Sequence, residues 1–459
     1  MGLDVLLAKP LVKHPIKKQG AGGDVGVPLG YLMLGGYLRA HSFHNVAIAP
    51  YRLRKAQGQE RNLEEDFLQH DVICAGACTC EAPDTIAMME VAKKLGKKRI
   101  LGGIFPTFNS EELLRKDKTD FIVRGEGEQT FLELLNALEI GTPLSEVKGI
   151  SYRDNGGVIH HNPDQDLIRG LDALPTPAYD LIPVKEYLPY TSGSIYGTRG
   201  CPRQCSFCTL SELWNYKYRS RSVSNIVDEA RHLSSLGFKR IHFKDESITT
   251  NPKWAYELFS ALEEADLDMK YKAKSRVGEL DETLLEQMLK AGLDTIHFGV
   301  ESITDSALVS MGKGISTQQT KEFIAMLAKN GCRANPVYMF GWPGETPESL
   351  RHNTEYILEN SLMRDTVTYI SFITPHPGSR IDGTLDGLQV LTKDLSRYTH
   401  KHPVAVPLSL GHNGLDLMVE QYHRVAEKTG TKEFNPRIEE SYLDELKGRT
   451  TELKLRKVS

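Results

Sequence analysis

Short apolar runs alternate with helical segments along the first 140 residues of the chain. The runs predict buried parallel strands at residues 4–8, 46–49, 71–77, 99–101 and 120–123. Between them, residues 29–40 place Met33, Leu34, Tyr37 and Leu38 on one helical stripe, and residues 84–95 carry a weaker stripe. We therefore expect an α/β fold that begins with a doubly wound sheet, Rossmann or flavodoxin-like, at residues 1–140.

A connector follows that sheet. Residues 149–152 and 158–161 predict a small hairpin around the turn sequence Asn155-Gly156-Gly157, and a proline-rich crossing comes next. We assign residues 141–190 to this connector.

A second strand-helix rhythm then predicts a partial (β/α)6 barrel at residues 191–375. Its strands are expected to begin near Ser194, Arg240, Lys270, Thr295, Asn335 and Thr366, and a helix follows each of the first five. Gly237, Gly292 and Gly331 stand where those helices should end. Residues 376–459 are expected to form a short α-rich C-terminal region that closes the barrel mouth, contacts substrate and ends in a charged, solvated tail.

The charge balance changes the list of possible partners. The net charge is -4 and no long block of lysine and arginine occurs, so we expect no nucleic-acid partner. The apolar start is too short for a secretory segment, and no apolar stretch reaches the length of a spanning helix. We expect a cytoplasmic protein without a membrane span.

The seven cysteines fall into groups, a pattern that indicates reduced thiols and not a disulfide framework. Cys201, Cys205 and Cys208 stand in a loop that glycine and proline make irregular. Three thiolates can hold a 4Fe-4S cubane and leave one iron open to an outside ligand. A structural zinc site would need a fourth ligand, for which Cys332 is the remaining candidate, in a separate predicted unit.

Cys74, Cys78 and Cys80 share one parity, so in a regular strand they would face the same way. A second metal site is conceivable there. Buried core or pocket lining is the simpler interpretation, because free cysteine is among the most buried residue types.

Polar residues stand at the carboxyl ends of the predicted barrel strands, where a barrel places its chemistry. They are Asp245 and Glu246, the triplet Lys274, Ser275 and Arg276, then Glu301, and then Gly341 and Pro343. Taken alone, each of these residues is equally well explained as a helix cap or a turn residue.

Taken in order, the three cysteines and these strand ends closely resemble the radical S-adenosylmethionine barrel. The resemblance implies that Cys201, Cys205 and Cys208 are catalytic as ligands of the 4Fe-4S cluster, and that the open iron binds S-adenosylmethionine. It further implies that Phe207 packs near adenine, Asp245 and Glu246 lie near the methionine amine, Ser275 and Arg276 near the carboxylate or ribose, Glu301 near ribose or amine, and Gly341 and Pro343 beside adenine.

The first 140 residues resemble the cobalamin-binding domain of cobalamin-dependent radical S-adenosylmethionine proteins. Four motifs carry the resemblance: PLGYLMLGGYLR from Pro28, CTCEAPDTI from Cys78, GGIFPTF from Gly102 and VRGEGEQTF from Val123. They imply a cobalamin site that includes Pro28, Thr79, Gly102, Gly103, Gly125, Glu126 and Gly127. The sequence departs from the pattern in two ways: the Asp-x-His-x-x-Gly signature is absent, and Phe105 stands where the family often has histidine.

The resemblance implies an enzyme that cleaves S-adenosylmethionine to a 5'-deoxyadenosyl radical and transfers a methyl group, with cobalamin, to an unactivated carbon of a small-molecule or lipid-like substrate. An external electron donor of the flavodoxin or ferredoxin type is expected. Ring formation, rearrangement or carbon coupling without methyl transfer is an alternative that the residues do not separate. A non-catalytic cobalamin or redox module is a third hypothesis, and the balanced charge disfavours methylthio transfer to transfer RNA.

Overall fold

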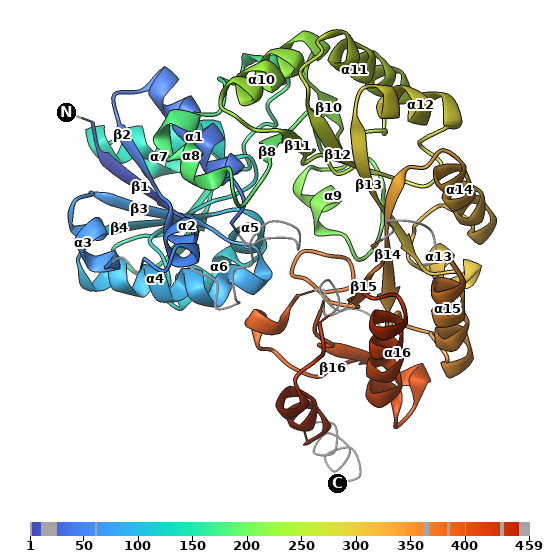
Figure 1. Ribbon diagram of the computed structural model, residues 1–459. Coiled ribbons are helices and arrows are strands. Elements are labelled where there is room, and N and C mark those ends of the chain that lie inside the picture. The colour runs from blue at the N-terminus through green and yellow to red at the C-terminus, as the bar shows by residue number, and fades with distance from the viewer. Residues whose placement is uncertain are drawn as a thin grey trace. The chain divides into compact units, whose positions relative to one another are not determined.

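The computed structural model describes residues 2–10, 25–59, 62–360, 367–382, 386–399, 401–431 and 436–448. It contains two compact units (Figure 1). Unit 1 comprises Met1–Gly200 and Leu213–His242, and unit 2 comprises Cys201–Glu212 and Phe243–Ser459.

Unit 1 is built on a seven-stranded sheet in the order β2-β1-β3-β4-β5-β6-β7. The strands are β1 (Asp4–Ala8), β2 (Asn45–Ala49), β3 (Val72–Gly76), β4 (Lys98–Gly102), β5 (Phe121–Val123), β6 (Ile150–Arg153) and β7 (Ile159–His161). The first five are parallel and confirm the predicted doubly wound sheet. The predicted hairpin also forms, but β6 pairs antiparallel with β5, so residues expected in a connector extend the sheet.

The helices of unit 1 follow the predicted rhythm. They are α1 (Leu29–His41), α2 (Tyr51–Ala56), α3 (Leu63–Leu68), α4 (Ala82–Lys94), α5 (Ile104–Phe108), α6 (Ser110–Arg115), α7 (Gly127–Ile140), α8 (Val184–Tyr187) and α10 (Val223–Ser235). Val5, Leu6 and Leu7 of β1 are almost fully buried, as expected for a strand covered on both faces.

A second sheet has the strand order β15-β14-β13-β12-β11-β8. Its strands are β8 (Gly193–Ile195), β11 (Arg240–Phe243), β12 (Lys270–Ser275), β13 (Leu293–Glu301), β14 (Arg333–Phe340) and β15 (Tyr369–Phe372). The strands β12 to β15 are parallel, as a partial barrel requires. The sixth strand was predicted to begin near Thr366, which lies outside the described residues; the described strand begins at Tyr369.

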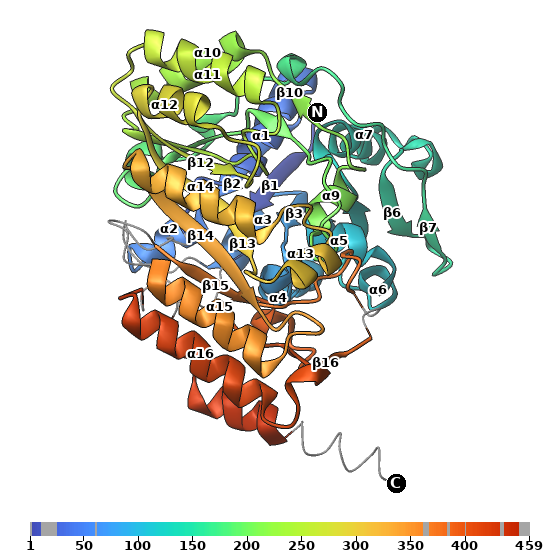
Figure 2. The same ribbon diagram turned by 90° about the vertical axis from the view of Figure 1, so that its right-hand side faces the viewer.

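Helices cover one face of this sheet in unit 2 (Figure 1). The unit's helices are α9 (Thr209–Leu213), α11 (Pro252–Glu264), α12 (Glu282–Lys290), α13 (Asp305–Ser310), α14 (Thr317–Lys329), α15 (Pro347–Asn360) and α16 (Gly414–Lys428). Asn251, Asp281 and Ser316 cap α11, α12 and α14 with side-chain hydrogen bonds, which fixes where each helix begins. In the C-terminal region, α16 packs against α15 (Figure 2), and β16 (Leu388–Val390) pairs with β17 (Ala405–Pro407).

The strands of unit 2 present two different faces. Tyr271 of β12 meets Phe259 of α11, and Phe298 of β13 meets Phe323 of α14, so these residues point into the helix layer. Side chains alternate along a strand, so Lys272, Lys274 and His297 point to the opposite face. We call this half-buried side of the strands the inner face.

Gly200 ends a short ladder in unit 1 between β9 (Thr198–Arg199) and β10 (Arg219–Ser220). Its φ of +93° lies in the region that only glycine adopts readily. A Cβ at this position would lie 1.9 Å from the carbonyl oxygen of Lys217. The chain therefore reaches Cys201 through a turn that excludes any side chain.

We predict that Gly200→Ala destabilises the protein by roughly 2–4 kcal/mol, because the left-handed backbone strain adds to the overlap with Lys217. The matched control is Gly58→Ala, since Gly58 also has positive φ, +71°, but has nothing within 4 Å of the added Cβ. That variant should lose only about 1 kcal/mol. Urea unfolding compares them, and equal losses would contradict the steric argument.

Candidate functional site

The three predicted cluster ligands lie in one irregular segment, residues 201–208, which we call the cysteine loop. Cys201 and Cys208 are half-buried, Cys205 is buried, and all three thiols are free. The backbone N–H of Cys208 donates to the carbonyl of Cys205 at 3.0 Å, and that of Ser206 donates to the carbonyl of Met311 at 2.9 Å. The loop is thus fixed by backbone bonds as well as by the side chains around it.

Charged side chains connect the cysteine loop to two other segments, the turn after β12 and the segment of Arg380. Arg203 donates from Nε and Nη2 to one oxygen of Glu279, at 2.9 and 2.7 Å. Arg380 donates to the carbonyl oxygen of Gln204 at 2.5 Å. The guanidinium of Arg276 lies 3.7 Å from Sγ of Cys205. Two predicted site residues, Arg276 and Cys205, are therefore in contact.

The thiols of the cysteine loop influence one another. Burial is the main cause that raises the pKa of the Cys201 thiol, and the neighbouring Cys208 and Cys205 thiols raise it further. Burial also raises the pKa of Cys208, opposed by hydrogen bonds from the backbone of Ser211 and Leu210. The three sulfurs are thus near neighbours that repel negative charge, and they favour occupancy by a positively charged iron centre.

The donor set fits a cubane cluster. Among the described residues, no three histidine, cysteine or carboxylate side chains are gathered as ligands for a single ion. A cubane binds each thiolate to a different iron, so its cysteines need not converge on one point. Three soft sulfur donors in one loop suit iron and sulfide, with the fourth iron left for another ligand.

The loop after β11, which carries Asp245 and Glu246, is bonded to the end of β12, which carries Ser275. Asp245 is fully buried and Glu246 is half-buried. Ser275, the last residue of β12, shares a hydrogen bond of 2.7 Å with the hydroxyl of Thr249, and Ile248 donates to the carbonyl of Lys274 at 2.9 Å. The two strand ends are thus connected side by side.

Glu301 forms a buried ion pair that the sequence did not indicate. Its carboxylate accepts a hydrogen bond of 2.6 Å from the ammonium group of Lys313, which also lies 5.9 Å from the ring centre of Phe207. The φ of Glu301 is +64°, an uncommon conformation for this residue type. A Cβ on Gly299 would lie 2.0 Å from the Glu301 carboxylate, so the pair occupies the space above a glycine. The end of β13, the segment of Lys313 and the cysteine loop meet at this pair.

The turn after β14 is organised by Glu345. This carboxylate accepts a hydrogen bond of 2.7 Å from the backbone N–H of Gly341 and one of 3.3 Å from the amide of Asn353. The amide oxygen of Asn353 in turn accepts from the N–H of Ile303 at 2.6 Å. Burial raises the pKa of Glu345 to about 7. Asn353 and Glu345 therefore join the turns that follow β13 and β14.

Two aromatic residues lie beside that turn. The rings of Phe207 and Trp342 meet edge to face with centres 6.2 Å apart, and Trp342 donates to the hydroxyl of Ser310 at 2.6 Å. Pro343 is half-buried. The structure thus brings Phe207 to the Gly341–Pro343 turn, as one adenine-binding region would require.

In unit 1, the predicted cobalamin residues lie at the carboxyl ends of the parallel strands. Gly102 ends β4, and Gly103 follows with φ of +88° and a Cβ position 3.3 Å from the backbone of Ala77. Gly125 has φ of +71°, and its N–H donates to the Thr107 hydroxyl at 3.2 Å. Such backbone at a sheet edge permits close approach by a large flat ligand.

The remaining cobalamin candidates lie next to helices or in a turn of unit 1. Pro28 precedes α1, the buried Thr79 begins a 3₁₀ turn after β3, and Gly127 begins α7. Phe105 is buried, and its phenyl ring has no atom that could ligate a metal.

Glu126 lies in a buried ionic network of unit 1. Its carboxylate accepts from Arg199 at 2.7 Å, from Arg219 at 2.8 Å and from the N–H of Ile168 at 2.8 Å. Arg199 also donates to Glu128 at 2.5 Å. Burial acts against the Arg199 charge, but pairing with Glu128 and Glu126 raises its pKa. The network itself accounts for Glu126, because a buried charge needs paired partners.

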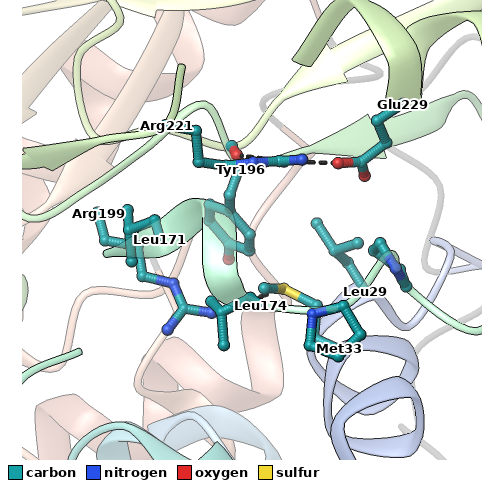
Figure 3. Close-up of a pocket in the computed structure, with 10 residues that line it drawn as sticks. Leu29, Met33, Leu171, Leu174, Tyr196, Arg199, Arg221 and Glu229 are labelled. Atoms are coloured by element: carbon teal, nitrogen blue, oxygen red, sulfur yellow. Dashed lines mark hydrogen bonds and ion pairs between the residues drawn. The ribbon is translucent and has the colours of Figure 1, made fainter. Parts of the chain in front are cut away.

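A small pocket adjoins this network (Figure 3). Leu29 and Met33 of α1 line one side, and the ion pair between Arg221 and Glu229, at 2.5 Å, lines another. Burial raises the pKa of Glu229, opposed by Arg221. The other lining residues are Leu171, Leu174, Pro175, Pro177, Tyr196 and Arg199.

The first cysteine group does not form the predicted row. The strand β3 ends at Gly76, so Cys78 and Cys80 lie in the turn beyond it, and the parity argument fails for them. Only Cys74 is buried in the strand, as core. The sulfurs of Cys78 and Cys80 are 3.5 Å apart and partly exposed.

Known protein families match both parts of the chain. The family model of the "Radical SAM superfamily" matches residues 195–357, and that of the "B12 binding domain" matches residues 21–135. The chain is 30% identical over 411 residues to an uncharacterized methyltransferase of Pyrococcus horikoshii, covering 88% of this chain and 87% of that protein. It is 27% identical over 429 residues to the anaerobic magnesium-protoporphyrin IX monomethyl ester cyclase of Rubrivivax gelatinosus, covering 90% and 76%.

The fold is similar to that of TsrM, a radical S-adenosylmethionine methyltransferase of Kitasatospora setae solved with cobalamin and a [4Fe-4S] cluster bound. The TM-score is 0.72 at 17% identity, over 96% of this chain and 90% of the other. Within the described residues, no helix has the length and apolar character needed to cross a membrane.

We predict that Glu345 makes the protein less stable as pH rises from about 4.5 to about 7. In this interval the folded protein, with a pKa of about 7 at Glu345, keeps a proton that the unfolded chain, with the ordinary value 4.5, has released. The contribution of Glu345 to the free energy of unfolding is complete below the pKa that this residue has in the unfolded chain. It is lost as pH rises through the pKa in the folded protein, and the loss amounts to roughly 3 kcal/mol.

Urea unfolding of the native protein and Glu345→Gln between pH 5 and 8 checks this. The difference between the two proteins should change with pH up to about 7 and then become constant. The control is Glu359→Gln, an exposed position on α15, the helix that follows the turn of Glu345. A pH-independent difference for Glu345→Gln would show that Glu345 is ionised throughout.

Proposed function

Since this chain belongs to the cobalamin-binding radical S-adenosylmethionine family, we propose that it transfers a methyl group to an unactivated carbon of a small-molecule or lipid-like substrate. The family makes the protein an enzyme whose cofactors are a 4Fe-4S cluster, S-adenosylmethionine and cobalamin. The observation that carries the proposal in this chain is the cysteine loop, with three free thiols held by charged residues of unit 2.

We assign the cluster to Cys201, Cys205 and Cys208. When bound, the cluster supplies the electron that cleaves S-adenosylmethionine to a 5'-deoxyadenosyl radical. The chain's part is to fix the loop: Arg203 pairs with Glu279, and Arg276 places a positive charge beside Cys205. A cation at this distance offsets the negative charge of a cluster held by thiolates, which favours retention of the cluster.

The strand ends of unit 2 supply groups for the two ends of S-adenosylmethionine. Asp245, Glu246 and Glu301 offer carboxylates to the methionine amine and ribose, and Ser275 and Arg276 offer donors to the carboxylate. Phe207, Gly341 and Pro343 would receive adenine, which an aromatic ring and open backbone suit. The contact between Phe207 and Trp342 supports this assignment.

In unit 1 we assign cobalamin to the carboxyl edge of the first sheet, at Pro28, Thr79, Gly102, Gly103, Gly125 and Gly127. The glycines fit because Gly103 and Gly125 take conformations that keep side chains off this edge. When bound, cobalamin supplies the methyl group. Glu126, predicted as a contact, is engaged by Arg199 and Arg219, so we propose that it positions the Gly125–Gly127 turn.

Methyl transfer is favoured by the relative that shares most identity among those described, a methyltransferase of 30% identity. The cyclase, at 27% identity over 90% of the chain, supports a second candidate, ring formation without methyl transfer. Both reactions need electrons, for which we propose a flavodoxin-type or ferredoxin-type donor.

We predict that Cys205→Ala abolishes cluster binding and lowers 5'-deoxyadenosine formation by at least about a thousandfold, because a cubane with two thiolates has lost one of its three caps. Iron, sulfide and cobalt analysis of the anaerobically reconstituted protein provides the readout: about four iron in the native protein, and about one cobalt. The control is Cys332→Ala, another buried free thiol, which lies outside the loop and should leave the iron content unchanged. Full sulfide and unchanged nucleoside cleavage in Cys205→Ala would contradict the assignment.

We further predict that label from methyl-labelled S-adenosylmethionine appears in the product of a reaction with cell extract as substrate source. Mass spectrometry of the product and of 5'-deoxyadenosine measures both in one sample. A labelled product supports methyl transfer, whereas 5'-deoxyadenosine with an unlabelled product selects ring formation or rearrangement instead.

A further inference from the structure

The inner face of unit 2 carries three lysines that the proposed cofactor sites do not use. Lys244 follows β11, and Lys272 and Lys274 lie on β12. Lys274 is in register with His297 of β13, and His297 is in register with Asn335 of β14. Because neighbouring strands lie about 4.8 Å apart, the side chains of Lys274, His297 and Asn335 form one continuous row across the face.

Lys274 is the key residue of this row. It is half-buried, and among the described residues its ammonium group has no hydrogen-bond or ion-pair partner. A buried or half-buried cation without a counter-charge is costly, and such groups usually meet an anion. The helix-covered face cannot provide one, because Tyr271 and Phe298 point there.

The electrostatic environment of His297 agrees with a positively charged face. Burial lowers the pKa of this imidazole to about 3, and the ammonium groups of Lys272, Lys274 and Lys244 lower it further. The ring is therefore neutral at physiological pH. It lies 5.6 Å from the ring centre of Tyr369, the next aromatic residue across the sheet.

Asn335 gives a second, independent observation. Its amide nitrogen lies 3.0 Å from Nε2 of His297, but its buried amide oxygen has no hydrogen-bond partner among the described residues. An unsatisfied buried amide costs about 1–3 kcal/mol unless water or a ligand occupies the site. The row therefore combines an unpaired cation with an unpaired polar atom, which together indicate a polar, charged occupant.

We infer that this row of Lys274, His297 and Asn335, with the charges of Lys244 and Lys272 near it, binds an anionic group of the substrate, a carboxylate or a phosphate. The inference rests on the proposed function, since it names the substrate class for that site. Lys274 precedes Arg276 by two residues, about 6.6 Å along a strand. The anion would thus be anchored one step from the proposed S-adenosylmethionine site, and the reacting carbon would lie a few bonds from the anion.

The test measures binding of inorganic phosphate and of acetate to the anaerobically reconstituted full chain, by calorimetry. We expect saturable binding of at least one anion to the native protein and a loss of about tenfold or more in Lys274→Met. Lys274→Arg should retain most of the affinity and shows that position 274 tolerates substitution. The matched control is Lys270→Met, an exposed lysine of the same strand, which should bind as the native protein does. Preference for phosphate or for acetate shows whether the anionic group of the substrate is a phosphate or a carboxylate.

Binding of neither anion to the native protein, or an equal loss in Lys270→Met and Lys274→Met, would overturn the inference. Formation of 5'-deoxyadenosine without added substrate is measured on the same samples and tests the proposed function separately. It should be unchanged in Lys274→Met, because Lys274 is not assigned to S-adenosylmethionine. If nucleoside cleavage persists while anion binding is absent, only the inferred substrate class is lost.

Discussion

One buried carboxylate, Glu279, makes the most hydrogen bonds among the side chains that fix the cysteine loop. Residues 201–208 contain no helix or strand, so their geometry must come from contacts with other segments. Glu279 accepts both hydrogen bonds of Arg203 and also the hydroxyls of Ser247 and Thr250. A single charge thereby joins the cysteine loop, the loop after β11 and the turn after β12. Charge-assisted bonds of this kind are stronger than neutral ones, and removing Arg203 would leave the carboxylate buried and under-compensated.

The remaining strand ends of unit 2 are joined in the same way, by side chains that form hydrogen bonds with the backbone of a neighbouring turn. Asn353 connects the turn after β13 to Glu345, and Glu345 fixes the N–H of Gly341. Met311 offers its carbonyl to Ser206, and the next residues bring Lys313 to Glu301. Parallel strands end without hairpins, so each loop is free to move independently unless such lateral bonds exist. The candidate site is therefore a set of loops held as one body, which is what a reaction that must confine a radical requires.

The sequence predicts what depends on local pattern. The apolar runs locate β1 at its observed bounds, and the cysteine spacing locates the loop, because both signals lie within a few residues. The partners of the loop lie far away in the chain: Glu279 is 76 residues from Arg203, and Arg380 is 176 residues from Gln204. No spacing rule connects such pairs. Lys313 and Asn353 were missed for the same reason, and the parity argument for Cys78 failed because a strand boundary, the least certain part of a pattern, falls at Gly76.

The charged groups on the inner face also differ along the strand direction. At the carboxyl ends the charges are mixed: Arg276 lies beside Cys205, and Lys313 is paired with Glu301, which suits a ligand that carries both an amine and a carboxylate. One step earlier on β12 and β13, the charges acting on His297 come from lysines. A zwitterion gains from the first environment and a plain anion from the second. Two ligands of different charge type would therefore favour adjacent positions, an arrangement that suits a reactive nucleoside and its target.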